Sequence, residues 1–211
     1  MKQIAELAQE FFGRFSVFRK KLPVNSCEAY ADFMATRSAF VAQKKLYEYV
    51  KTRMGLQYPE RFRDEVFIES LNIAKWNVYA ACMSDLAIWM ASQTLQRTGD
   101  RAQAAQLATI FFTANAHERL APGFEEGVSP LTTAFADRLA LVDWKAAGET
   151  EVVFRHSTSE LVRWSPIAPD LKKYDREIVE NSLRFAWMRI REEFHHLYDH
   201  EAFMADWTRE N

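Results

Sequence analysis

Residues 64–97 read DEVFIESLNIAKWNVYAACMSDLAIWMASQTLQR, a run that contains neither proline nor glycine. At about 100° per residue, apolar side chains fall on every side of this segment. One side carries Leu71, Val78, Ala81 and Trp89, and another carries Trp76, Tyr79, Met83 and Met90. A helix that is apolar all round belongs in the interior of a protein. We therefore expect residues 64–97 to form the central helix of the molecule.

Proline and glycine divide the remaining chain into long segments that are rich in helix-forming residues. The predicted helices cover residues 2–21, 26–54, 101–120 and 130–147, and a last one runs from about 170 or 175 to about 207. Residues 148–169 are expected to be loop with a short helix ending near Trp164, and 149–157 are either strand or loop. The sequence thus predicts an all-α fold, a single domain over residues 1–211 in which five or six helices form an antiparallel bundle.

Composition limits both function and location. The chain has 211 residues, of which 48% are hydrophobic, and this is enough for one sizeable core. Its 27 basic and 29 acidic residues give a net charge of −2, whereas nucleic-acid-binding domains are usually basic. No signal peptide or membrane-spanning stretch is recognisable. We expect a cytoplasmic protein that binds no nucleic acid and keeps Cys27 and Cys82 as buried, reduced thiols.

Three of the five histidines lie in the run EEFHHLYDHE, residues 192–201. On the predicted last helix, Glu193, His196 and His200 are spaced i, i+3 and i+7, so they share one flank of that helix. One carboxylate and two imidazoles in this spacing can bind a divalent metal ion together. The alternatives are that the histidines belong to a solvated helix end or to a pH-sensitive or partner-binding surface.

Two acidic residues elsewhere in the chain could complete a metal site. Glu118 falls on the apolar stripe of the predicted helix 101–120, and Asp85 falls on an apolar stripe of the helix 64–97. A carboxylate on an apolar face must be paired, protonated or bound to metal. The full set of predicted metal ligands is Glu193, His196, His200, Glu118 and Asp85. The simpler alternative for the last two is a buried ion pair, for which Lys75, Arg37 and Arg119 are available.

No complete catalytic arrangement can be assembled from the sequence. Leu197 follows His196, so the HExxH motif of zinc enzymes is absent. The Glu-x-x-His spacing of di-iron proteins occurs on one predicted helix, whereas those proteins need it on two. Residues 127–131 read GVSPL and lack the last glycine of the serine-hydrolase elbow G-x-S-x-G. Serine-esterase chemistry is therefore not expected, and catalytic residues remain unknown.

The N-terminal residues 1–22 are a candidate interaction element. They have the pattern of an amphipathic helix, with an apolar stripe from Ile4 to Leu22 and the basic run Arg19-Lys20-Lys21 near the end. We expect this helix to pack onto the bundle or onto a partner chain. Contact with an anionic membrane surface is an alternative, but the mixed charge of the polar face argues against it.

The predicted last helix offers a second apolar surface. Phe185, Met188 and Phe203 lie on its otherwise polar side. Packing against another helix of the same chain is the simpler explanation, since a helix in a bundle often has two neighbours. Contact with another protein chain is the alternative.

Two stretches carry a resemblance to known proteins, namely RFSVFRKKLPVNSC at residues 14–27 and FVAQKKLY at residues 40–47. They are similar to a group of uncharacterised bacterial all-helical proteins of about this length, and the similarity extends over most of the chain. Some members of that group are called esterases. The resemblance implies a bacterial, cytosolic, single-domain protein, and it implies no catalytic residues.

Taken together, these patterns predict a non-catalytic helical protein that self-associates or docks a protein partner. One alternative is an enzyme or sensor that holds a divalent metal ion through the histidine and glutamate cluster. Another is a bundle that encloses an apolar ligand, which the 16 Phe and 6 Trp would permit.

Overall fold

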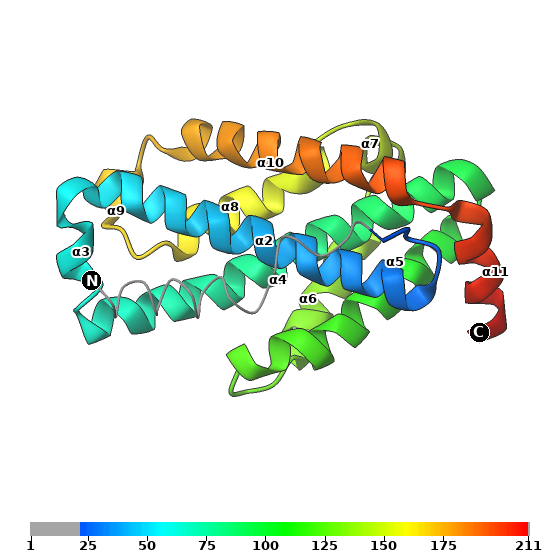
Figure 1. Cartoon of the computed structure of the whole chain (residues 1–211), viewed down its shortest axis with the longest axis horizontal. Helices are drawn as coiled ribbons and strands as arrows, with labels where there is room; N and C mark the ends of the chain where they lie inside the picture. The colour runs from blue at the N-terminus through cyan, green and yellow to red at the C-terminus, as the bar shows by residue number, and fades with distance from the viewer. Residues whose placement is uncertain (1–21, 211) are drawn as a thin grey trace.

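The computed structural model describes residues 22–210, which are mostly helical (Figure 1). Within this range there is no β-strand, and the nearest approach to one is an isolated parallel bridge between Val24 and Tyr198. The predicted all-α class is therefore confirmed. The predicted helix 2–21 lies outside the described residues, and its expected role as an interaction element stays a prediction.

Seven helices of ten or more residues and three shorter ones make up the described part of the chain. The longer ones are α2 (Cys27–Met54), α4 (Glu65–Thr98), α5 (Arg101–Asn115), α6 (Ser129–Ala140), α8 (Arg155–Trp164), α10 (Arg176–Leu197) and α11 (His200–Glu210). The shorter ones are α3 (Tyr58–Arg61), α7 (Trp144–Glu149) and α9 (Pro169–Lys172). This number exceeds the five or six that we expected, because turns at residues 141–143, 173–175 and 198–199 divide predicted helices and because α3 was not expected.

Helix α4 lies among the other helices as its sequence predicts. It begins after Asp64, whose side chain accepts hydrogen bonds from the backbone N–H groups of Val66 and Phe67. It ends at Gly99, where φ is +72°, a left-handed conformation that glycine adopts readily. Every residue from 78 to 94 is buried, and α2, α5, α7 and α8 pack against the helix. No helix in residues 22–210 combines the length and the apolar content needed to cross a membrane.

Aromatic side chains fill much of the interior. The Phe194 ring of α10 stacks on Tyr198 with 4.6 Å between ring centroids and meets Trp89 of α4 edge-on at 5.3 Å. Such ring pairs add stability beyond the area that they bury. The high aromatic content of the chain is therefore explained at least in part by core packing.

Residues 148–169 are more regular than the sequence suggests. A 3₁₀ turn at Val152–Phe154 leads directly into α8, so residues 149–157 contain no strand. Val153 and Phe154 are buried, and the backbone N–H of Ser157 donates to a carboxylate oxygen of Asp85 at 2.8 Å. The expected short helix ending near Trp164 is confirmed. The start of this helix was missed because its capping group comes from α4.

The chain leaves helical geometry at Tyr198, between α10 and α11 (Figure 1). The backbone of Val24 forms hydrogen bonds on both sides of Tyr198. Its N–H donates to the Leu197 carbonyl at 2.8 Å, and its carbonyl accepts from the Asp199 N–H at 3.1 Å. The Tyr198 hydroxyl lies 2.9 Å from Oγ1 of Thr94 in the interior. The prediction of one continuous helix to about residue 207 is wrong here, because contacts with remote segments replace the helical hydrogen bonds.

Candidate functional site

Glu193, the first predicted metal ligand, is held by Arg37 of α2. The Nε and Nη2 groups of Arg37 donate to the two carboxylate oxygens at 3.1 and 2.8 Å. The Glu193 side chain is 17% exposed. A bidentate arginine–carboxylate pair is among the stronger hydrogen-bonded ion pairs. Glu193 therefore links α10 to α2, and both of its oxygens are engaged.

His196 and His200 lie on different helices. His196 is exposed in the last turn of α10, and His200 is the first residue of α11. The break at Tyr198 removes the i, i+4 relation that would let the two imidazoles reach one metal ion from a single helix. The Nδ1 atom of His200 lies 3.2 Å from the Tyr198 hydroxyl. Burial, followed by the positive charge of Arg97, lowers the pKa of His200 below its usual 6.5.

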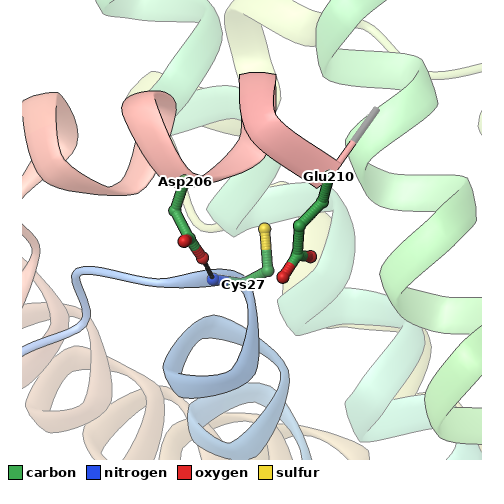
Figure 2. Close-up of side chains that lie close together, drawn as sticks. All are labelled: Cys27, Asp206 and Glu210. Carbon is green, nitrogen blue, oxygen red and sulfur yellow. Dashed lines mark hydrogen bonds between the residues drawn. The ribbon is translucent and has the colours of Figure 1, made fainter.

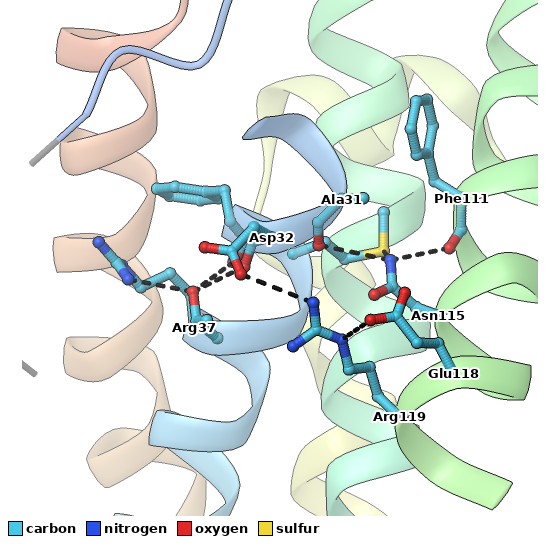
Figure 3. A network of polar contacts seen from close by, with 10 residues as sticks. Ala31, Asp32, Arg37, Phe111, Asn115, Glu118 and Arg119 are labelled. Carbon is cyan, nitrogen blue, oxygen red and sulfur yellow. Dashed lines mark hydrogen bonds and ion pairs between the residues drawn. The ribbon is translucent and has the colours of Figure 1, made fainter. Parts of the chain in front are cut away.

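Glu118 is not on the buried side of its helix. Residues Ala116–Leu120 form a π-helical turn after α5, and a π turn holds more residues than an α turn. The predicted stripe assumed a constant α-helical rotation, so it placed Glu118 wrongly. The Glu118 side chain is 68% exposed and pairs with Nε of Arg119 at 2.9 Å. Arg119 also approaches Asp32 of α2 at 3.7 Å, so the pair belongs to a surface network between α2 and the π turn (Figure 3).

Asp85 is fully buried on α4 and forms an ion pair with Arg138 of α6 at 2.5 Å. Its second carboxylate oxygen accepts from the Ser157 N–H at the start of α8. Arg138 also donates to the Val153 carbonyl at 2.8 Å. The simpler interpretation, a buried ion pair, is confirmed for Asp85. The partner is none of the three cations that the sequence offered, because α6 brings Arg138 to α4 from another part of the chain.

The predicted ligands do not converge. In residues 22–210, one group of histidine, cysteine or acidic side chains has three potential ligand atoms within 4.8 Å of one another, and it consists of Cys27, Asp206 and Glu210. None of the predicted residues belongs to that group. Metal binding by Glu193, His196, His200, Glu118 and Asp85 stays a prediction that this geometry does not support.

The group of Cys27, Asp206 and Glu210 lies where α11 meets the first turn of α2 (Figure 2). Asp206 accepts a hydrogen bond from the Cys27 backbone N–H at 2.8 Å. Burial is the main cause that raises the pKa of the Cys27 thiol to about 12, and the two carboxylates contribute further. Without a metal ion, the thiol is thus protonated at neutral pH. Acidic groups at a helix N-terminus stabilise the helix, so capping of α2 accounts for this cluster. Both cysteines are free and buried, as predicted.

His156 and Ser157 lie beside Asp85, but they do not form a hydrolase site. The Ser157 hydroxyl donates to the Phe154 carbonyl at 3.1 Å and accepts from Nε1 of Trp187 at 3.3 Å. The residue is fully buried. Burial, the largest cause, lowers the pKa of His156 below its usual 6.5 despite the nearby Asp85 carboxylate. Ser157 therefore serves the packing of α8 and α10, and no substrate can reach its oxygen.

The cavity next to Trp187 is too small for an organic ligand. Phe154 and Thr158 also line it, and its volume is about 30 Å³. Pockets that bind drug-sized ligands measure about 300–1,000 Å³. The rings of Phe154 and Trp187 are stacked with 4.7 Å between their centroids, so the aromatic surface here is already covered. This cavity gives no support to the alternative of an enclosed apolar ligand.

The outer face of α10 exposes large apolar side chains. Ile178 is 68% exposed, Phe185 is 63% exposed and Met188 is 42% exposed. Steps of seven and three residues place the three on one side of an α-helix, and we call them the α10 outer stripe. The other side of the same helix is core, with Val179, Leu183, Trp187, Ile190 and Phe194 all buried. Helix α10 is therefore apolar on two opposite sides, of which the described residues cover one.

Phe203 differs in its burial from Phe185 and Met188, the two residues that the sequence grouped with it. It is fully buried on α11, stacked on Tyr30 with 4.6 Å between ring centroids. Packing inside the chain is thus confirmed for Phe203, whereas residues 22–210 leave Phe185 and Met188 largely exposed. The sequence could not separate the three because it predicted a single helix, whereas α11 turns away after Tyr198.

Comparison of the chain with protein-family models, with curated proteins and with solved structures found no match. The function must therefore be argued from the side chains themselves. Of the features described above, the α10 outer stripe is the one that neither core packing nor helix capping explains.

Proposed function

We propose that this protein is a helical binding protein without catalysis of its own, and that it docks another protein chain through the α10 outer stripe. The observation that carries the proposal is the exposure of Ile178, Phe185 and Met188 on the side of α10 opposite to the core. Helices that are recognised by other proteins present apolar anchors at steps of three, four and seven residues, and the steps of seven and three in the stripe fit this spacing. Contiguous apolar surface that is left exposed is a mark of interaction sites.

The groups that could have supported chemistry have structural roles instead. Arg37 holds Glu193, Arg138 holds Asp85, and the Ser157 hydroxyl is buried between two partners. The two ion pairs and the hydrogen bond from Trp187 to Ser157 join helices that are distant in the sequence. This favours a protein whose polar interior groups stabilise a scaffold, and the scaffold presents α10 for binding.

For the whole chain, we propose a single antiparallel helical bundle that acts in the cytoplasm. Helix α4 anchors the bundle in this proposal, since the neighbouring helices pack around it. Helix α10 closes one side of the core and turns its second apolar face outward. This arrangement favours docking, because a helix that is already rigid loses little conformational entropy when it binds a partner.

Site-specific photo-crosslinking tests the proposal. The full chain would carry a photoreactive phenylalanine analogue in place of Phe185 and be irradiated in living cells of its source organism. We expect a discrete product of higher mass, because a docked chain would lie within reach of this side chain. The matched control places the same analogue at Leu141, which is 87% exposed at the end of α6 and outside the stripe.

We expect a crosslinked product at position 185 and none at position 141. A discrete product at position 185 with none at position 141 supports docking through α10. Equal yields at both positions, or no product at 185 from a folded and expressed chain, contradict it.

A further inference from the structure

We propose that the chain docked on the α10 outer stripe is a second copy of this protein, which packs its own α10 antiparallel to the first about a twofold axis. This inference rests on the proposed function, since it names the partner of the same surface. Three observations support it: the spacing of the stripe, the apolar area that it exposes and the distribution of charge along its edge.

The spacing suits a helix as the partner. On α10, positions 178, 181, 185 and 188 follow steps of three, four and three residues, which is the heptad spacing of two helices packed side by side. Ile178, Phe185 and Met188 occupy three of these four positions, and the exposed Asn181 occupies the other; Tyr174, which is also exposed, lies in the turn just before α10. A polar residue in the middle of an apolar seam favours one register over its alternatives.

The exposed area suits a reversible dimer. Tyr174 is 79% exposed and Phe185 is 63% exposed. With about 150–250 Å² for each aromatic side chain, and somewhat less for Ile178 and Met188, the four residues expose roughly 400 Å² of apolar surface. A symmetric pair would therefore bury about 800 Å² through these side chains alone, which is below the roughly 1,200 Å² of specific interfaces, so the flanking residues must supply the rest and the dimer must be weak. We expect a dissociation constant of about micromolar order.

Charge along one edge of the stripe favours the antiparallel direction. Glu177 and Arg184 are seven residues apart, so they lie on the same edge of the stripe, and both are exposed. In an antiparallel pair with its axis near Asn181, Glu177 of each copy faces Arg184 of the other. The Arg184 side chain is 61% exposed, and its Nε group also pairs with Glu151 of the same chain at 2.9 Å.

The parallel direction would bring like charges together. In parallel helix pairs, an edge residue faces the residue five positions later on the partner's opposite edge. Arg184 of one copy would then face Arg189 of the other, and two cations in contact destabilise a helix pair. The antiparallel register also places Phe185 of each copy beside Ile178 of the other, so large apolar groups cover each other.

Analytical ultracentrifugation of the purified full chain, over concentrations on both sides of the micromolar range, tests the inference. We expect a reversible equilibrium between monomer and dimer. Phe185→Asp should weaken the dimer roughly 100-fold, since it buries a charge in an apolar seam. Leu141→Asp is the matched control and should leave the equilibrium unchanged. Circular dichroism would check that each variant is folded, which we expect because both side chains are exposed.

A charge exchange tests the direction of the helices. Glu177→Arg and Arg184→Glu should each weaken the dimer roughly tenfold, because each places two like-charged contacts across the axis. The double variant should return the affinity to within about threefold of the original, since the pairs are restored with their signs reversed. Residues 177 and 184 are two helical turns apart, so this rescue cannot arise within one helix.

The possible negative results distinguish an error in the homodimer from an error in the proposed function. A chain that stays monomeric at all concentrations, a dimer that Phe185→Asp leaves intact, or a double variant that binds no more tightly than Arg184→Glu alone would each overturn the antiparallel homodimer. If the purified chain is monomeric while the photoreactive group at position 185 still yields a discrete product with another protein, the proposed function stands and only the identity of the partner is wrong. A product that joins position 185 to residues 1–21 of the same chain would make that segment the occupant and overturn both proposals.

Discussion

Arg138 and Asp85 form the most deeply buried ion pair among the described residues, with Asp85 at 0% and Arg138 at 22% side-chain exposure. Replacement of Arg138 by leucine would leave a buried carboxylate without its counter-ion. We expect Arg138→Leu to lower the free energy of unfolding by about 3 kcal/mol, as for other broken buried pairs. Urea unfolding followed by circular dichroism measures this change.

The control for that experiment is an exposed pair. Arg163 pairs with Glu160 at 3.5 Å, and its side chain is 69% exposed. Arg163→Leu should change the free energy of unfolding by less than about 1 kcal/mol, because solvent screens such pairs. If the two variants lose equal stability, the structural role assigned to Arg138 is wrong.

The histidines predict how stability depends on pH. Burial, the largest cause, lowers the pKa of His156, His195 and His200 below 6.5 in the folded chain. The unfolded chain, with ordinary histidine pKa values of about 6.5, then binds more protons below that pH. The contribution of these residues to stability is therefore fully present above about pH 6.5 and is lost as the pH falls below it. The free energy of unfolding should decrease between pH 7.5 and pH 5.5.

His156 has the most buried imidazole of the three, and replacing it measures how much of the pH dependence of stability this residue causes. His156→Gln keeps a polar side chain of similar size but cannot gain a proton in this range. Its unfolding free energy should depend less steeply on pH than that of the original chain. An unchanged slope would assign the pH dependence to other groups.

At the scale of single residues, sequence patterns predicted the chemical role of a side chain but not the residue with which it pairs. The apolar surroundings of Asp85 predicted a paired carboxylate, and this is confirmed, yet nothing near Asp85 in the sequence points to Arg138 of α6. For Glu118 the error was geometric, because the π turn at residues 116–120 cancels the constant rotation on which the stripe relied. Likewise, no spacing rule connects Cys27 with Asp206, since the two meet only after α11 folds back onto α2.

Among the elements, helices with local stop and start signals were predicted well. The predicted helix 64–97 agrees with α4 to within one residue at each end, because Asp64 caps it and Gly99 ends it. No proline or glycine in the sequence marks the break between α10 and α11. Val24 and Thr94 create it through hydrogen bonds from remote segments, and these contacts cannot be read from a local pattern.

The junction of α11 with α2 yields a prediction at the scale of elements. Asp206 accepts from the first N–H of α2 at 2.8 Å, and Ser26 accepts from the Ala29 N–H at 3.2 Å. We expect Asp206→Ala to lower the free energy of unfolding by about 1 kcal/mol, the usual effect of losing a capping group. Chemical denaturation measures it, with Glu69→Ala, an exposed acid within α4, as the control that should stay within about 0.5 kcal/mol. Equal effects of the two substitutions would show that Asp206 does not hold α11 to α2.

At the scale of the whole molecule, the docking of a second copy would couple folding to concentration. Because a dimer binds only folded chains, dimerisation stabilises the fold by an amount that grows with protein concentration. For a chain of this size, each kcal/mol raises the thermal midpoint by about 2–4 °C. We expect the midpoint of the original chain to rise by a few degrees, on the order of 3 °C, over a hundredfold increase in concentration.

Differential scanning calorimetry at a series of concentrations measures that rise, provided that unfolding is reversible. Phe185→Asp should show a midpoint that does not change with concentration, and it should match the original chain at the lowest concentration, where both are monomeric. This comparison separates an effect on the interface from an effect on the fold, because a destabilised monomer would unfold earlier at every concentration. A concentration-independent midpoint for the original chain would mean that the exposed apolar face of α10 does not pair with itself, and that its partner must be sought among other proteins.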